Sequence, residues 1–163
     1  DGVSGDIISE AKSLDQKFEY PTRSIVSYAQ NREDVLLWRA FHHLDTGFYI
    51  DVGAHDPEVI SVTRAFYERG WSGINIEPDP FFAEKLRRTR ERDRTLQVAL
   101  GRCPGKAVLF DFGDSGLSTT KQDIAIDTLV SGRQVGQRDV EVMTLSGILA
   151  ELIGQEVHFL KID

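Results

Sequence analysis

The chain has 163 residues, a formal net charge of −7 and 40% hydrophobic residues. That length is typical of one domain, which would bury about 70% of the surface of its unfolded chain. The negative charge argues against general binding to nucleic acid backbones, and no apolar run approaches the ~20 residues that a membrane-spanning helix needs. We therefore expect a single domain with no nucleic acid partner and no membrane span.

The chain opens with a segment that has no clear periodicity. Residues 1–26 are interpreted as a lead-in or linker, and residues 27–163 as the folded domain. The opening is too polar for a secretory signal, which favours a cytoplasmic location. The only cysteine, Cys103, has no companion for a disulfide or a thiolate metal site, and we expect no metal. An apolar stripe predicts a first helix from about Glu33 to His43.

An apolar strand next opens into a small, acidic turn. Phe48-Tyr49-Ile50 leads into Asp51, Gly53 and Ala54, and the small residues allow a ligand to approach the backbone closely. Asp56-Pro57 is a good helix start, which predicts a helix to about Arg69 with its first amides facing that ligand. Gly70 suits the left-handed cap at its end.

The same pattern repeats around residue 77. A strand near Ile74 ends at Glu77, 26 positions after Asp51, and Asp79-Pro80 starts the next helix. That helix leads into a basic run, Lys85 to Arg94, which is interpreted as a solvated face rather than a site for a phosphorylated acceptor.

The remaining segments alternate weakly between strand and loop. The least readable part lies between the polar loop and Gln137. We predict strands at about residues 95–100, 106–112, 139–143 and 157–162. A polar loop is expected at residues 113–120, and a short helix capped by Thr144 at residues 144–152. The 139–143 strand is expected to be exposed or at an edge. Parallel strands near residues 48, 74, 96 and 158, with an antiparallel pair between the last two, define an α/β fold with a mostly parallel sheet.

The carboxyl ends of the strands indicate a nucleoside site. Ligands in open α/β sheets bind beyond those ends, where Glu77 can accept hydrogen bonds from both hydroxyls of a ribose. The turn has only one glycine, Gly53, and Asp51 lies where a pyrophosphate would need bare amides, which disfavours a dinucleotide. S-adenosylmethionine fits better, because Asp51 could approach its ammonium and sulfonium groups. An ordinary α/β turn with solvated acids is the alternative.

Four stretches of the chain resemble the FkbM-type family of S-adenosylmethionine-dependent methyltransferases. Their order and spacing are more specific than any one of them alone. They are Ser27 to Leu37 (SYAQNREDVLL), Asp51 to Asp56, Ile74 to Pro78 (INIEP), and Leu160 to Asp163 (LKID). The chain departs from the family pattern at His55, commonly Asn, and at Pro57, commonly Gly, and it stops where the last motif normally continues.

The resemblance implies a Rossmann-like methyltransferase fold and O-methylation of sugars in polysaccharides or glycosylated metabolites. In such a sheet the last strand is interior, so the domain is expected to be truncated at its C-terminal side. The open edge would then pair with later residues, with other domains of a longer chain, or with another copy in an oligomer.

The resemblance also implies roles for individual residues. Asp51, Gly53 and Ala54 are assigned to the methionine side, Glu77 with Pro78 to the ribose, and Asp163 to a place beside the cofactor. His55 and Asp34 are the catalytic candidates, although local hydrogen bonding explains either residue as well. Further cofactor contacts are assigned to Gln30, Ala99, Leu100 and Ser115.

Three functions remain open at this point. The first is the methyltransferase acting on a glycan or a small hydroxyl acceptor. The second is a noncatalytic cofactor-binding or assembly module of a larger glycan-building protein. The third is an NAD-dependent oxidoreductase, which the single-glycine turn disfavours.

Overall fold

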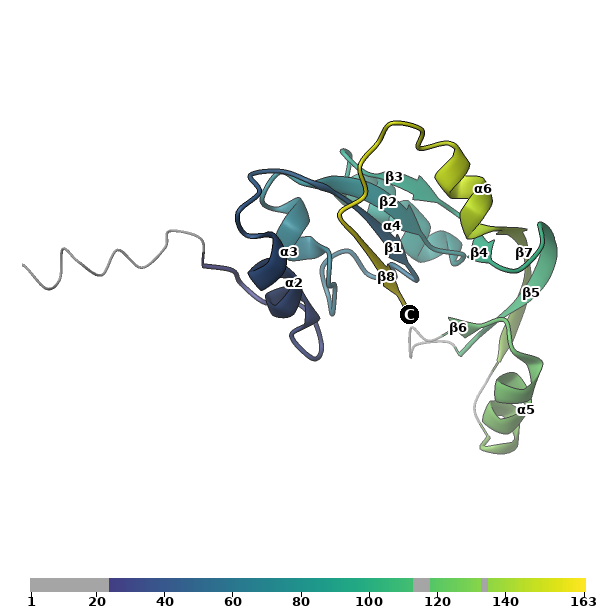
Figure 1. The fold of residues 1–163 in the computed structure, drawn as a ribbon. Helices are drawn as coiled ribbons and strands as arrows, with labels where there is room; N and C mark the ends of the chain where they lie inside the picture. Colours follow the sequence, from purple (N-terminus) through teal and green to yellow (C-terminus); the bar gives the residue numbers. More distant parts are fainter. Residues whose placement is uncertain (1–23, 113–117, 133–134) are drawn as a thin grey trace, which may run out of the picture.

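A computed structural model describes residues 24–112, 118–132 and 135–163 (Figure 1). Two sheets organise this part of the chain. Sheet A has the strand order β3-β2-β1-β8, and sheet B has the order β4-β7-β5-β6. The lead-in up to residue 23 and the candidate Ser115 lie outside the described residues.

Sheet A is entirely parallel. Its strands are β1 (Phe48–Val52), β2 (Ser72–Ile76), β3 (Arg94–Leu96) and β8 (Phe159–Ile162). Strand β1 pairs with β2 on one side and with β8 on the other, so β8 is an edge strand within the described chain. The four parallel strands expected from the sequence are therefore confirmed.

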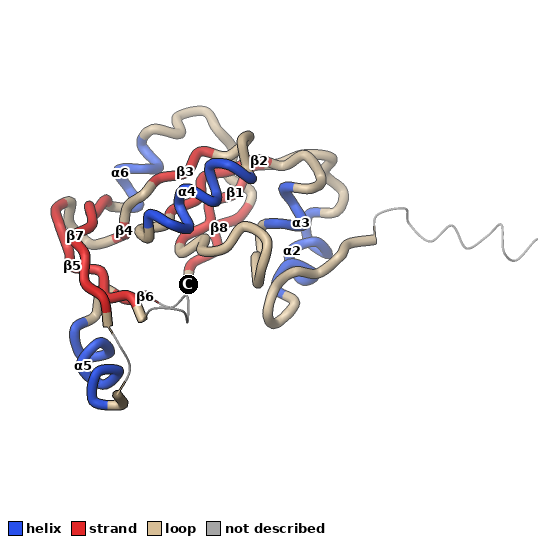
Figure 2. The backbone as a smooth tube through the Cα atoms, turned by 180° about the vertical axis from the view of Figure 1, so that it is seen from behind, coloured by secondary structure: helices blue, strands red, loops and turns tan. Residues whose placement is uncertain are grey.

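The helices cover both faces of sheet A. Trp38 of α2 (Glu33–Phe41) and Phe66 of α3 (Arg64–Tyr67) pack with Tyr49 and Phe159 on one face. On the other face Ile148 of α6 (Leu145–Ala150) packs against alternate residues of β1 and β2, which include Ile50, Val52, Ile74 and Ile76. Helix α4 (Pro80–Thr89) lies across the sheet in the view of Figure 2.

Sheet B contains the antiparallel pair expected from the sequence. Strand β5 (Gly105–Asp111) runs antiparallel to β7 (Gly136–Met143) and to the short β6 (Ser118–Thr119). Strand β4 (Ala99–Leu100) pairs parallel with the other side of β7. Helix α5 (Gln122–Val130) follows β6 and extends away from sheet A (Figure 1).

Two expectations for individual elements were wrong, and a third was right only in part. The strand predicted over residues 95–100 is divided between β3 of sheet A and β4 of sheet B, because residues 97 and 98 turn the chain from one sheet to the other. Strand β7, predicted to be exposed or at an edge, pairs with both β4 and β5 and so is interior in its sheet, but its side chains at Asp139 and Glu141 are exposed as expected. The polar loop predicted at residues 113–120 contains β6 at its end, and α5 lies in the segment up to Gln137, for which no element was predicted.

The helix predicted from Pro57 to Arg69 is also wrong for most of its length. Only Arg64–Tyr67 is helical, although Gly70 does adopt the predicted left-handed conformation with φ 87°. Asp56 accepts hydrogen bonds from the amides of Glu58 and Val59, at 2.8 and 3.1 Å, as a helix cap would. Ile60 then has φ 52°, which ends any helical turn at that point.

Close packing across the β1–β2 pair makes Gly73 a sensitive position. A Cβ atom there would overlap both the ring and the backbone carbonyl of Tyr49, and the carbonyl cannot move without breaking the sheet. We expect Gly73→Ala to lower the free energy of unfolding by about 3 kcal/mol, measured by urea denaturation. The control Gly105→Ala places its Cβ in open space at the start of β5 and should change stability by less than about 0.5 kcal/mol. Equal effects would contradict this packing.

Candidate functional site

The carboxyl ends of β1, β2 and β8 meet at one edge of sheet A. The strand order reverses here, because β1 continues through α3 to β2 on one side while β8 pairs on the other side. In open α/β sheets, ligands bind beyond the strand ends at such a reversal point. Asp51, Gly53, Glu77 and Asp163, which the sequence singled out, all lie at these ends.

The turn after β1 bends sharply onto β2. Gly53 has φ 67°, and a side chain there would bring its Cβ within 3.3 Å of Asp163 Cβ, so glycine suits both the conformation and the space. The amides of Gly53 and Ala54 both donate to the carbonyl of Ile76, at 2.9 and 3.3 Å. These two amides are therefore committed to β2. The amides expected to face a ligand, those of the predicted helix start, include Glu58 and Val59, which donate to Asp56.

Glu77 holds the two loops of the site together. Its carboxylate is 3% exposed and accepts hydrogen bonds from the amides of His55 and Asp79, both at 2.8 Å. Asp79 in turn caps α4 by accepting from the Phe81 amide at 2.8 Å, which confirms the predicted helix start. Burial raises the pKa of Glu77, and the two amide donors oppose that shift.

Because the pKa of Glu77 is raised, this residue should make the free energy of unfolding depend on pH. The folded chain binds the Glu77 proton more tightly than the unfolded chain, so the cost of keeping this carboxylate charged falls as pH decreases towards its ordinary value of 4.5. We expect the free energy of unfolding of the wild type, relative to Glu77→Gln, to increase as pH falls from 7 to about 4.5. Urea denaturation at several pH values measures it, and a difference that decreases over this range would contradict the assignment.

Asp51 is buried and already has two partners. Its carboxylate is 1% exposed, with Oδ2 accepting from the Thr63 hydroxyl at 2.7 Å and Oδ1 lying 3.0 Å from the Lys161 ammonium. Lys161 also pairs with Asp163, whose side chain is 76% exposed. The sequence reasoning treated Lys161 only as part of a motif. Its position two residues before Asp163 on β8, opposite Asp51 in register, could have indicated the ion pair.

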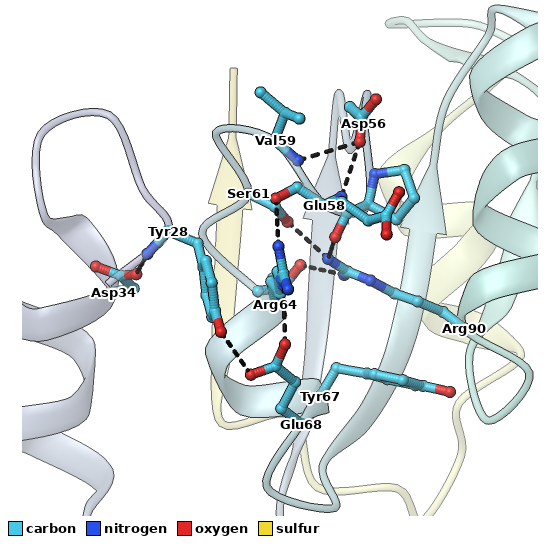
Figure 3. A network of polar contacts seen from close by, with 12 residues as sticks. Tyr28, Asp34, Asp56, Glu58, Val59, Ser61, Arg64, Tyr67, Glu68 and Arg90 are labelled. Atoms are coloured by element: carbon cyan, nitrogen blue, oxygen red, sulfur yellow. Dashed lines mark hydrogen bonds and ion pairs between the residues drawn. The ribbon is translucent and has the colours of Figure 1, made fainter. Parts of the chain in front are cut away.

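A second buried cation, Arg90, fixes the loop after the turn (Figure 3). It is 2% exposed and donates to the Pro57 carbonyl at 2.8 Å, to the Ser61 hydroxyl at 2.6 Å and to the Thr63 hydroxyl at 2.6 Å. Because the Thr63 hydroxyl also donates to Asp51, a continuous chain of hydrogen bonds joins Arg90 to Asp51. The sequence reasoning missed this residue, which lies within a run interpreted as solvated.

Three other cationic contacts hold the same loop from outside. Lys85 pairs with Asp56 and Glu58, at 2.8 and 2.9 Å, and the Arg64 guanidinium donates to the Glu58 carbonyl at 2.7 Å. Arg64 also stacks on the Tyr28 ring, 3.8 Å from its centroid (Figure 3). The loop that replaces the predicted helix is thus fixed by side chains from distant elements.

His55, a catalytic candidate, occupies an uncommon backbone conformation. It has φ 51°, and its ring lies against Phe82 with ring centroids 3.8 Å apart. Its Nε2 atom is buried and has no hydrogen-bond partner among the described residues. Non-glycine residues with positive φ are concentrated at functional sites. His55 therefore combines a strained backbone with a buried ring nitrogen that has no partner among the described residues.

Asp34, the other catalytic candidate, has a structural task that accounts for its burial. It is fully buried and accepts from the Ser27 hydroxyl and from the amides of Tyr28, Ala29 and Val35, at 2.6 to 3.1 Å. Four donors use the roughly four lone-pair positions of a carboxylate. The catalytic role of Asp34 stays a prediction.

The remaining candidates differ in exposure and in the sheet to which they belong. Gln30 is exposed in the turn before α2, and Pro78 is half-buried directly after Glu77. Ala99 and Leu100 form β4, so they belong to sheet B and not to the end of a sheet A strand. Ala99 packs with Leu109 and Val140 in the core of sheet B. The cofactor contacts assigned to these four residues stay predictions.

Comparison with known families identifies the class of protein. The chain is an α/β protein whose candidate site lies at the carboxyl ends of parallel strands. The family model of the methyltransferase FkbM domain matches residues 51–163, which is more than half of the chain. The chain belongs to this family of methyltransferases, as the four stretches indicated. No curated protein and no solved structure matches the chain.

None of the helices in residues 24–112, 118–132 and 135–163 is long and apolar enough to cross a membrane. Over the same ranges, no group of three or more His, Cys, Asp or Glu side chains is placed to hold a metal ion.

Proposed function

We propose that the chain is an S-adenosylmethionine-dependent methyltransferase that O-methylates a sugar hydroxyl of a glycan, a polysaccharide or a glycosylated metabolite. The single observation that carries this proposal is the buried Glu77 at the end of β2, beside the Gly53 turn, inside a segment that matches the FkbM domain. The sugar acceptor rests on the family resemblance alone.

The sheet topology supports a Rossmann-like fold. The parallel order β3-β2-β1-β8 corresponds to strands 3-2-1-4 of a doubly wound sheet, with the reversal between its first and fourth strands. We take residues 27–163 as the cofactor-binding domain and residues 1–26 as its lead-in. We also propose a cytoplasmic location, with which the exposed free thiol of Cys103 is compatible.

The residues at the strand ends fit a cofactor of this kind. Each Glu77 oxygen accepts one amide and keeps a second lone pair, which can accept a ribose hydroxyl. Asp163 offers an exposed carboxylate beside Gly53, where the methionine end would lie. The cofactor would supply a methyl group bonded to a positively charged sulfur, and an acceptor oxygen can attack the carbon of that methyl group.

His55 is the group that we assign to the acceptor. Its free Nε2 can accept the proton that the hydroxyl loses when its oxygen is methylated, and Phe82 and the Glu77 contact fix the ring and the backbone. Asp34 is assigned a positioning role instead, because it holds the segment that carries Gln30.

Transfer of a labelled methyl group from S-adenosylmethionine to a panel of glycans tests this proposal. We expect label in a sugar hydroxyl with the wild type, and a loss of about 100-fold in rate with His55→Ala at unchanged cofactor affinity. Binding of the cofactor without any transfer would favour a noncatalytic module instead. Binding of NAD in its place would favour an oxidoreductase.

A further inference from the structure

Lys161 has no donor left for a ligand. Its ammonium donates to the carbonyls of Gly53 at 2.7 Å and Val52 at 3.3 Å, and it lies 3.0 Å from Asp51 Oδ1 and 2.8 Å from Asp163 Oδ2. These four oxygens surround a side chain that is 13% exposed. Lys161 therefore acts as an internal counter-ion between the ends of β1 and β8.

The two carboxylates around Lys161 differ in what they can offer. Asp51 is 1% exposed; one of its oxygens accepts from Thr63, and the other forms an ion pair with Lys161 and has no hydrogen bond of its own. Asp163 is 76% exposed and uses one oxygen on Lys161. The formal charge of the three side chains is −1, and the accessible part of that charge lies on Asp163.

The charge state of Lys161 is secure in this arrangement. Burial acts to lower its pKa, but the attraction of Asp51 and the hydrogen bond with Asp163 together raise the pKa of Lys161 above its ordinary value. Lys161 thus stays protonated at neutral pH and is not a candidate general base.

We propose that Lys161 sets the charge selectivity of the cofactor site: it neutralises Asp51, so that Asp163 becomes the carboxylate that meets a cationic ligand. This inference rests on the proposed function and replaces the expected contact between Asp51 and the ammonium and sulfonium groups. Lys161 acts through its two aspartates and is a positioning residue.

The consequence is a preference that depends on ligand charge. S-adenosylmethionine carries a positive sulfur and S-adenosylhomocysteine a neutral one, while the rest of the two molecules is alike. The net charge of −1 on Asp51, Lys161 and Asp163 stabilises the charged sulfur more than the neutral sulfur. Removing or adding one charge should change the ratio of the two dissociation constants. A purely structural role of Lys161 would instead weaken the binding of both ligands alike.

Calorimetric titration of both ligands into three forms of the chain tests the proposal. Asp163→Asn removes the exposed charge and should lower the preference for S-adenosylmethionine over S-adenosylhomocysteine by roughly three- to tenfold. Lys161→Met adds one net negative charge and should raise the same preference by a similar factor. The control Glu156→Gln removes an exposed acid before the opposite end of β8 and should leave the preference unchanged.

Each outcome decides one question. Opposite shifts of the ratio of the two dissociation constants in Asp163→Asn and Lys161→Met support the proposal. An unchanged ratio in Asp163→Asn overturns it. This holds even if Lys161→Met fails to fold, because the exposed Asp163 can be replaced without burying an unpaired group. A wild type that binds neither ligand would overturn the proposed function itself and is recognised before any variant is made.

Discussion

Glu77→Ala should weaken the binding of S-adenosylmethionine by tenfold or more. The variant removes the acceptor of two ribose hydroxyls, and hydrogen bonds to a charged group contribute about 1.5 to 3 kcal/mol each. It also leaves the buried amides of His55 and Asp79 without their acceptor, so the free energy of unfolding should fall by about 1 to 3 kcal/mol. Calorimetry at a temperature where the variant is folded, checked by circular dichroism, measures the affinity.

Two comparisons separate binding from folding in this experiment. Glu77→Gln keeps one side-chain oxygen as an acceptor. It should therefore lose less affinity for S-adenosylmethionine, and less free energy of unfolding, than Glu77→Ala. Glu91→Ala removes an exposed acid just after α4 and should change neither. Unchanged affinity in a folded Glu77→Ala would remove this residue from the site.

Arg90→Met should lower the free energy of unfolding by about 3 to 5 kcal/mol, a large part of the 5 to 15 kcal/mol typical of a domain. The methionine has a similar length but no donors, so the Pro57 carbonyl and the hydroxyls of Ser61 and Thr63 lose their common partner inside the protein. Because Thr63 also holds Asp51, the loss should extend to the strand end. Urea denaturation measures the change.

The matched variant Arg88→Met tests whether burial causes this effect. Arg88 lies in the last turn of α4, two residues before Arg90 at the helix C-cap; it is 77% exposed and pairs with Glu84 at 2.8 Å. Exposed pairs of this kind contribute little, and we expect a change within about 0.5 kcal/mol. Similar losses in the two variants would show that the loss of one arginine charge, and not the buried network, determines stability.

Local signals in the sequence predicted the elements that depend on local contacts. The Asp79-Pro80 start of α4 and the Thr144 cap of α6 lie where expected, since each cap bonds an amide a few positions away. Strand β1 also lies where expected, because its apolar run is visible in the sequence although its partners β2 and β8 are distant. Glu77 and Gly53 were found for the same reason. A strand that ends in a carboxylate, and a glycine at a tight turn, are visible in a short stretch of sequence.

The parts that sequence reasoning missed depend on distant partners. Asp56-Pro57 carries a helix-start signal, but the following residues are fixed by Arg90 and Lys85, which arrive from α4. Nothing near residue 90 distinguishes the buried Arg90 from its exposed neighbours. The division of residues 94–100 between two sheets likewise depends on β7, more than 30 positions later. Tertiary contacts override local preference at these places.

Thermal unfolding with S-adenosylmethionine, S-adenosylhomocysteine and NAD tests the central claim, that the ends of β1, β2 and β8 form a cofactor site. A ligand at about 100 times its dissociation constant adds about 2.7 kcal/mol to the free energy of unfolding. We predict a clear rise in melting temperature with the first two ligands, none with NAD, and a smaller rise in Glu77→Gln. A rise with NAD alone, or with none of the three, would contradict the account.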